Sequence, residues 1–160
     1  MIRHRLPLWS WLLLPLLPAC SSYAPPDALI GMSRDEMVAR MGQPSMERRV
    51  DAGSRLEFTR GLFGTQTWFV YFDAAGRAIR AEQVLTEKNF NRIDVGMAQD
   101  DVLKMLGQPS EVQMLGRARG VVWNYRYDNF SCIWFQIELS LQKQVRSVGY
   151  GEPPECQRRD

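Results

Sequence analysis

Histidine is almost absent from this sequence: the only one among 160 residues is His4. Histidine is the side chain that most often transfers protons in catalysis, and it is the commonest protein ligand of metal ions. His4 lies in residues 1–19, a segment that we expect to be removed from the mature chain. We therefore expect no Ser-His-Asp triad, no histidine-based metal centre and no cofactor, and we predict that the protein is not an enzyme.

An excess of charge of one sign is also missing. The full chain has 20 basic and 18 acidic residues. Residues 1–19 contain Arg3 and Arg5 and no acidic residue, so the rest of the chain has 18 basic and 18 acidic groups. A chain without net positive charge does not attract the phosphate backbone of DNA or RNA. Nucleic acid is therefore excluded as a partner.

The sequence lacks an apolar run long enough to cross a membrane as a helix. Its longest run, residues 6–17, has about twelve residues, whereas a spanning helix needs roughly twenty. Pro7 and Pro15 further disfavour a continuous helix in this run. Basic residues precede the run and small residues follow it, which is typical of a secretory signal peptide.

The apolar run ends in Leu17-Pro18-Ala19-Cys20, which resembles the lipobox of bacterial lipoproteins. The resemblance implies that residues 1–19 are cleaved, that Cys20 carries acyl chains such as palmitate, and that residues 20–28 form a lipidated tether. Acyl chains contribute about 0.8 kcal/mol per buried methylene, so several of them hold a protein at a membrane. Ser21 follows the cysteine, which in this class implies the periplasmic face of the outer membrane. An ordinary signal peptide, in which Cys20 has no role, is the alternative.

Cysteine is scarce, and Cys132 and Cys156 are the two that remain after the expected lipid anchor. An even number of cysteines in an oxidising compartment predicts a disulfide. The bond would tie the C-terminal tail, residues 151–160, to the preceding body. Closing a loop of about 25 residues in this way would stabilise the fold by roughly 3 kcal/mol. Two free thiols are the alternative.

A repeated unit occupies most of the remaining chain. Gly31-Met32 recurs as Gly96-Met97, and Gly42-Gln43-Pro44-Ser45 recurs as Gly107-Gln108-Pro109-Ser110, each 65 residues further on. A four-residue identity at constant spacing indicates an internal repeat. We predict two tandem units, residues 29–85 and residues 86–150. They are expected to share an interface, because a unit of about 65 residues is marginal for independent folding.

Each unit is predicted to begin with a short helix. Ser33 and Glu36 have the spacing of a capping box, and a glycine followed two residues later by proline is typical of a helix end. A further short helix is expected at residues 87–92, with a weaker counterpart at residues 26–30. Acidic residues at both helix starts suit the helix dipole. A catalytic carboxylate pair is the alternative for Asp35-Glu36 and Asp100-Asp101.

Strands are expected after each helix. Alternating apolar and polar residues, as in Phe135 and Ile137 against Trp134 and Gln136, are typical of a strand with one buried face. The expected fold class is α+β, with two tandem copies of a short helix pair packed on a three-stranded antiparallel sheet. The strands are expected at residues 55–60, 66–72, 77–85, 121–127, 132–141 and 145–150.

Aromatic side chains are the remaining candidates for a binding site. Most of them are expected in the core, but alternation on a sheet leaves some outside. An exposed tryptophan or tyrosine is a good anchor for a protein partner or a lipid headgroup. The candidates are Trp68, Tyr71, Trp123 and Trp134.

The repeated motifs, followed by Trp123-Asn124-Tyr125, resemble those of the BamE-like (SmpA/OmlA) family of small outer-membrane lipoproteins. The resemblance covers residues 29–150 as two copies, whereas the typical member of the family has one. It implies a pair of short helices on a three-stranded antiparallel sheet. It also implies a role beside the machine that inserts β-barrels, with contacts to another lipoprotein subunit and to phosphatidylglycerol.

The leading hypothesis is a non-enzymatic, BamE-like lipoprotein that contributes to outer-membrane protein assembly or envelope integrity. Its partners would be assembly proteins, and it would meet the membrane through its lipid anchor. The first alternative is a periplasmic inhibitor or sensor that binds a protein through its sheet surface. The second is lipid binding or transfer, which requires an apolar cavity.

Overall fold

The computed structural model of the chain describes residues 26–51, 53–60, 63–116 and 120–157. The expected signal peptide, residues 1–19, and the expected lipidation site, Cys20, lie outside the described residues and stay predictions. Within these ranges, no helix is both long enough and apolar enough to span a membrane.

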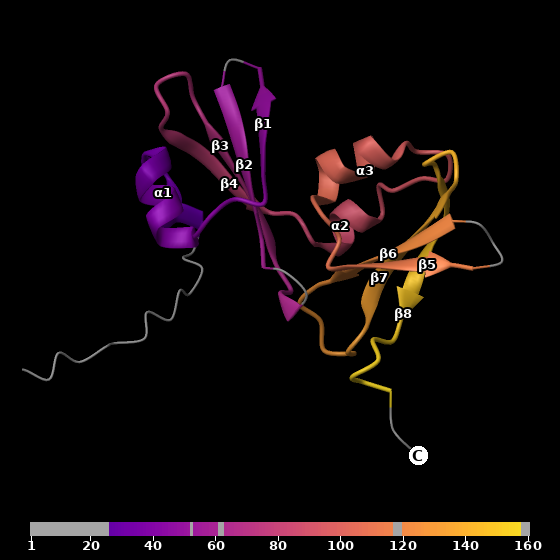
Figure 1. Cartoon of the computed structure of the whole chain (residues 1–160). Helices are drawn as coiled ribbons and strands as arrows, with labels where there is room; N and C mark the ends of the chain where they lie inside the picture. The colour runs from indigo at the N-terminus through magenta and orange to yellow at the C-terminus, as the bar shows by residue number, and fades with distance from the viewer. Residues whose placement is uncertain (1–25, 52, 61–62, 117–119, 158–160) are drawn as a thin grey trace, which may run out of the picture.

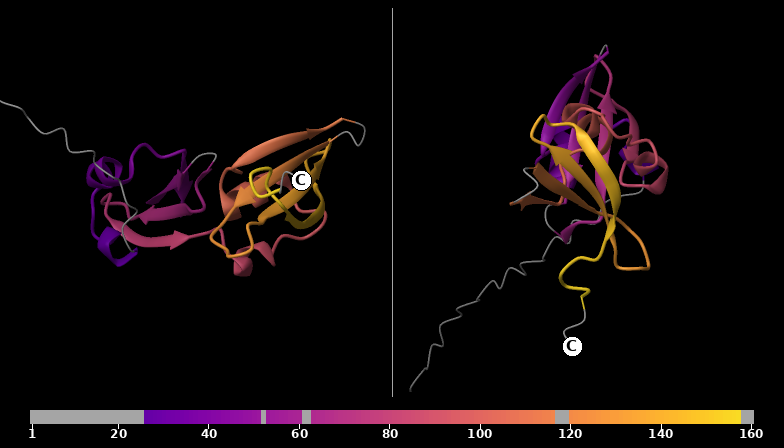
Figure 2. Two further views of the ribbon diagram at one scale, coloured as in Figure 1. Left: turned by 90° about the horizontal axis from the view of Figure 1, so that it is seen from below. Right: turned by 90° about the vertical axis from the view of Figure 1, so that its right-hand side faces the viewer.

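Two antiparallel sheets of four strands each form the body of the molecule. In both sheets the strands lie side by side in chain order. The left view of Figure 2 shows the two sheets as separate bodies next to each other. The first sheet consists of β1 (Met46–Val50), β2 (Gly53–Thr59), β3 (Thr67–Phe72) and β4 (Ala78–Gln83). The second consists of β5 (Glu111–Leu115), β6 (Gly120–Arg126), β7 (Trp134–Ser140) and β8 (Val145–Gly151).

The prediction of three-stranded sheets is wrong, because each unit has an additional first strand. β1 and β5 begin directly after the two Gly-Gln-Pro-Ser motifs. Both are edge strands, and neither contains a buried residue. A strand without a buried face does not need the alternation of apolar and polar residues by which strands are recognised in a sequence. The sequence Met-Glu-Arg-Arg-Val of β1 therefore has no strand signal.

The prediction of a helix pair in each unit is also wrong, and the fold is mostly sheet. Its first member is a single 3₁₀ turn, η1 (Pro26–Leu29), in the first unit and a four-residue helix, α2 (Glu87–Phe90), in the second. Among the described helices, only α1 (Arg34–Met41) and α3 (Gln99–Leu106) have eight residues. The first turn of a helix fixes several backbone angles for a single hydrogen bond, so starting a helix costs free energy. These two segments do not continue beyond that first turn.

The two longer helices begin and end where their sequences dictate. Ser33 and Glu36 form the predicted capping box at the start of α1, whereas α3 begins after Ala98 without a side-chain cap. Gly42 and Gly107 end the helices with φ angles of 86° and 75°, in the left-handed region that favours glycine.

The elements are stacked in four layers, which Figure 1 shows from left to right as α1, the first sheet, α2 with α3, and the second sheet. One core lies between α1 and the first sheet and contains Met37, Leu56 and Val70. A second core lies between α3 and the second sheet and contains Leu106 and Ile137. Each helix therefore buries the apolar face of the sheet that follows it in the chain.

The first sheet also packs against the second unit through its other face. Phe69 of β3 belongs to the second core. Arg55 Nη1 donates to the carbonyl oxygen of Lys104 in α3, at 3.0 Å. Gly107, at the end of α3, lies so close to the first sheet that an added Cβ would be 3.1 Å from Thr67 Cγ2. In the described part of the chain, the first sheet thus has a helix on both faces, whereas the second sheet has helices on one face.

Candidate functional site

Three of the four aromatic candidates are buried. Trp68, Trp123 and Trp134 are 7, 6 and 4 % exposed, so they present little area to a partner. Trp68 belongs to the first core and Trp123 to the second. Tyr71 is half-buried on the first sheet, with the guanidinium of Arg80 3.6 Å from the centre of its ring. The structure does not bring the four residues together; Tyr71 and Trp134 line separate pockets on different sheets.

The predicted disulfide is present. Cys132 and Cys156 are bonded, with their Cα atoms 6.3 Å apart. The bond joins the segment before β7 to the C-terminal tail. Within the tail, Glu155 forms an ion pair with Arg126 of β6, and Pro153 is buried. These contacts fix the tail to one end of the second sheet.

Among the described residues, no helix covers the face of the second sheet that is turned away from α2 and α3, and we call it the open face. Residues that lie opposite each other in an antiparallel pair share a face, so the strand register defines its side chains. The pairs Glu111–Asn124, Asn124–Gln136 and Arg126–Trp134 place these residues on the open face. Their neighbours Trp123, Phe135 and Ile137 point into the second core.

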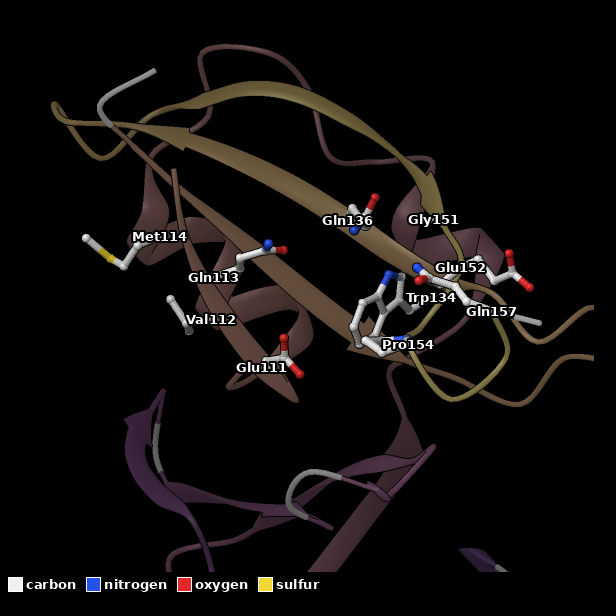
Figure 3. A pocket seen from close by; sticks show the side chains of 10 residues that line it. All are labelled: Glu111, Val112, Gln113, Met114, Trp134, Gln136, Gly151, Glu152, Pro154 and Gln157. Atoms are coloured by element: carbon white, nitrogen blue, oxygen red, sulfur yellow. The ribbon is translucent and has the colours of Figure 1, made fainter. Parts of the chain in front are cut away.

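A pocket of about 610 Å³ lies on the open face, between β5 and the C-terminal tail. Figure 3 shows Glu111 and Gln113 on the β5 side, Glu152 and Pro154 on the tail side, and Gln136 on β7 between them. Gln136 Nε2 donates to Asn124 Oδ1 at 2.9 Å, so two amide side chains are joined beside the pocket. The complete lining is Glu111, Val112, Gln113, Met114, Trp134, Gln136, Gly151, Glu152, Pro154 and Gln157.

Several polar groups around this pocket have no partner among the described residues. Trp134 Nε1, Asn124 Nδ2 and Arg126 Nε are buried donors without a hydrogen bond. Leaving a buried donor unpaired costs roughly 1–3 kcal/mol, so such a group normally meets an acceptor from water or a ligand. The carboxylates of Glu111 and Glu152 form no ion pair with the described residues.

The first sheet shows what the corresponding face of such a unit contacts. Met46, Glu57 and Phe69 are opposite one another in its register, as Glu111, Asn124 and Gln136 are in the second sheet. In the first sheet this face is covered by the end of α3. Glu57 is fully buried there and accepts hydrogen bonds from Arg48 at 2.7 Å and Arg55 at 2.5 Å. In the second sheet no element of the described chain takes the place of α3.

A second pocket, of about 480 Å³, lies where β1 and β2 meet α3. Four basic side chains line it, and Arg55 Nε is a buried donor without a partner. One acid, Glu47, also lines the pocket and is paired with Arg34 at 2.7 Å. Arg48 and Arg55 are paired with Glu57, and Lys104 is paired with Asp101, so Arg49 is the basic side chain of this lining without an ion pair among the described residues. The lining consists of Glu47, Arg48, Arg49, Val50, Arg55 and Lys104.

Sequence reasoning did not select Asn124, Gln136 or the Arg55–Glu57 pair. The alternation of apolar and polar residues along β7 predicts that Gln136 points away from the core, and Gln136 could have been selected from this signal. Asn124 is fully buried, and the alternation of apolar and polar residues along the strands does not predict this burial. No group of three or more histidine, cysteine, aspartate or glutamate side chains in the described ranges is arranged to hold a metal ion.

Comparison with known proteins identifies no family for this chain. No family model matches, and no curated protein matches. Among solved structures, a candidate β-lactamase inhibitor protein from Streptococcus mutans is similar over 76 % of this chain and 83 % of its own, with 9 % identity and a TM-score of 0.35. An extracellular protein containing an SCP domain from Bacillus anthracis is similar over 88 % of this chain but only 49 % of its own, with 14 % identity and a TM-score of 0.34. A DUF4309 family protein from Bacillus subtilis is similar over 76 % of this chain and 78 % of its own, with 14 % identity and a TM-score of 0.30.

Proposed function

We propose that this chain is a non-enzymatic protein-binding module whose docking surface is the open face of the second sheet. The observation that carries the proposal is the contact within the chain itself. The corresponding face of the first sheet binds α3 through Phe69, Arg55 and the close approach of Gly107. The first copy of the repeated unit thus uses this face to bind another part of the protein. In the second copy the same kind of face is free of any described element.

The chemistry of the open face supports the same proposal. Specific interfaces combine a buried aromatic centre with polar groups whose hydrogen bonds are completed by the partner. Trp134 stacks with the Arg126 guanidinium, which lies 5.1 Å from its ring, and its own N–H has no acceptor. The amides of Asn124 and Gln136 lie next to it. A partner would meet this face at the exposed side chains that line the pocket, such as Gln113 and Glu152.

The proposal includes the cellular setting that the lipobox and the BamE-like resemblance imply. In it, Cys20 is acylated, residues 20–28 form the tether, and the module lies at the periplasmic face of the outer membrane. The partner is then an outer-membrane assembly protein. The alternative partner is a periplasmic protein that the module inhibits or senses. The Cys20→Ala variant distinguishes them, because an inhibitor keeps its activity when released from the membrane, whereas an assembly factor loses it.

Site-specific photocrosslinking in cells tests the docking surface. A benzophenone amino acid replaces Gln113 on the open face of the full-length protein, and the control replaces Ile79, which is 59 % exposed on β4. We expect one dominant adduct from position 113 and none from position 79. Mass spectrometry of the adduct then identifies the partner. Equal labelling from both positions, or none from position 113, would refute the open face as the docking surface.

A second candidate function is binding of an anionic headgroup, favoured by the basic pocket at β1, β2 and α3. Phosphatidylglycerol has this chemistry. The test is flotation of the Cys20→Ala protein with vesicles of phosphatidylglycerol or of phosphatidylcholine. We expect binding to the anionic vesicles alone and a loss of binding in the Arg49→Gln variant. Equal flotation with both lipids would rule this candidate out.

A further inference from the structure

β5 is an edge strand with one side unpaired. In the described part of the chain its only strand neighbour is β6. An edge strand presents unpaired N–H and C=O groups, and natural proteins normally protect such an edge with charged side chains. β5 has a single charged residue, Glu111, at its first position.

The corresponding strand of the first sheet is protected in this way. β1 carries Glu47, Arg48 and Arg49 in five residues. Glu47 pairs with Arg34 at 2.7 Å, and Arg48 pairs with the buried Glu57 at 2.7 Å. The two edges occupy equivalent positions in their sheets, so their difference is specific to β5.

β5 instead exposes apolar side chains. Val112 is 52 % exposed and Met114 is 76 % exposed, and the two residues share one face of the strand. On the other face, Glu111 and Gln113 border the pocket of about 610 Å³. An added strand would therefore place one set of alternate side chains beside Val112 and Met114 and the other set beside Glu111 and Gln113, and all four of these β5 residues line the pocket.

The charges at the pocket indicate the side chain that it accepts. Glu111 and Glu152 line it and form no ion pair among the described residues. A basic side chain of the added strand would be attracted by both carboxylates.

We propose that β5 binds an extended segment of a partner protein as a fifth strand of the second sheet, with apolar residues of that segment over Val112 and Met114 and a basic residue in the pocket. The inference rests on the proposed function and states how the partner engages the open face. Strand addition of this kind takes its affinity from main-chain hydrogen bonds and its specificity from alternate side chains.

A second copy of the chain is a poorer occupant of this edge. In an antiparallel pair of two β5 strands that places Val112 opposite Met114 of the copy, residues opposite each other share a face. The copy would then bring its own Glu111 and Gln113 to the pocket. In this register the Glu111 of the copy lies opposite Leu115 and its Gln113 lies opposite Gln113, so the copy brings no basic side chain to pair with Glu111 and Glu152.

The test uses a capped heptapeptide of alternating valine and lysine, added to the full-length protein in detergent micelles. Nuclear magnetic resonance reports which backbone amides shift. We expect shifts in β5 and in the tail residues that line the pocket, and about tenfold weaker binding when glutamate replaces lysine in the peptide. A peptide with proline at its centre should not bind, because proline cannot complete the ladder. Shifts elsewhere, equal binding of all three peptides, or dimerisation through β5 without peptide would overturn the proposal.

Two matched variants separate strand addition from simple charge attraction. Met114→Glu places a charge on the exposed edge, and Val148→Glu places the same charge on β8, where Val148 is 42 % exposed. The added carboxylate attracts lysine through space in both variants. Only Met114→Glu should weaken binding of the valine–lysine peptide, by about tenfold. If Met114→Glu changes neither the binding of the peptide nor the in-cell adduct from position 113, strand addition is wrong, but the open face is still the docking surface. If position 113 gives no adduct in cells, the docking surface itself is wrong.

Discussion

Glu57 and Asn124 occupy the same place in the two sheets. The carbonyl oxygen of Glu57 accepts from the backbone N–H of Ser45 at 2.7 Å, and that of Asn124 accepts from Ser110 at 2.9 Å. Both serines end a Gly-Gln-Pro-Ser motif. The side chains differ: Glu57 neutralises two arginines beneath α3, whereas Asn124 is uncharged and lies by the pocket of the open face. The same backbone position thus belongs to the contact with α3 in one unit and to the open face in the other.

Replacing Glu57 should be strongly destabilising. Glu57→Gln keeps the side-chain volume but removes the charge that compensates Arg48 and Arg55, and Arg55 is only 6 % exposed. Removing one partner of a buried ion pair costs about 3–5 kcal/mol. Urea denaturation measures the loss. The control is Glu47→Gln, whose ion pair with Arg34 is exposed and should contribute about 0–1 kcal/mol. Equal losses in the two variants would contradict the buried network.

The contact between the two units can be measured with a pair of glycines. Gly42 and Gly107 end equivalent helices with positive φ and extended ψ, so an alanine is strained at either position, by roughly 1–3 kcal/mol. An added Cβ meets nothing within 4 Å at Gly42, but it would be 3.1 Å from Thr67 Cγ2 and 3.3 Å from Phe69 Cε1 at Gly107. We expect Gly107→Ala to lower the free energy of unfolding more than Gly42→Ala. Equal losses of unfolding free energy in the two variants would mean that Gly107 is not in close contact with the first sheet.

The sequence predicts the strands with a buried face and misses those without one. The expected positions of β2, β3, β6 and β7 are correct to within a few residues, because apolar residues of these strands face a core. Those of β4 and β8 are correct to the same extent, although each of these strands has a single buried residue. β1 and β5 are stabilised mainly by backbone pairing with β2 and β6, and this pairing produces no pattern in their side chains. The helix partners η1 and α2 are single turns, too short for a periodic pattern.

The candidate site is less predictable, because it depends on contacts between segments that are distant in the chain. The disulfide follows from counting cysteines, and it is present. The aromatic residues were the natural candidates for binding, but tryptophan is also the side chain with the largest area to bury. The pocket is made by β5, β7 and the tail together, and its most informative groups, Asn124 and Gln136, are ordinary amides in the sequence.

Alkaline pH should weaken the fold through two tyrosines. The hydroxyls of Tyr127 and Tyr150 both donate to the carboxylate of Glu87. Burial, and then the Glu87 carboxylate, raise the pKa of Tyr150 to about 12, and the same causes raise the pKa of Tyr127 further. The folded state therefore holds these protons at a pH where the unfolded chain, with an ordinary tyrosine pKa of about 10, has lost them. Stability is complete below about pH 10 and falls as the pH rises towards 12.

Denaturation at several alkaline pH values measures this loss, and tyrosinate absorbance reports the ionisation itself. Tyr127→Phe and Tyr150→Phe should each reduce the fall in stability between about pH 10 and 12, since each removes one proton that the folded state retains. An unchanged pH dependence in both variants would show that Glu87 does not hold these hydroxyls.

Alanine variants at two glycines of β8 test the shape of the pocket separately from the stability of the sheet. An added Cβ at Gly151 would be 2.3 Å from Gln136 Oε1, so Gly151→Ala must displace the Gln136 side chain and break its bond to Asn124. At Gly149, on the same strand and face, an added Cβ meets nothing within 4 Å. Because the displaced group is the end of a flexible side chain, we expect Gly151→Ala to change the free energy of unfolding by less than about 1 kcal/mol. It should nevertheless reduce the in-cell adduct from position 113 several-fold, whereas Gly149→Ala should leave the adduct unchanged. If the two alanine variants give the same adduct as the wild-type chain, the amides of Gln136 and Asn124 do not contact the partner, and docking depends on β5 alone.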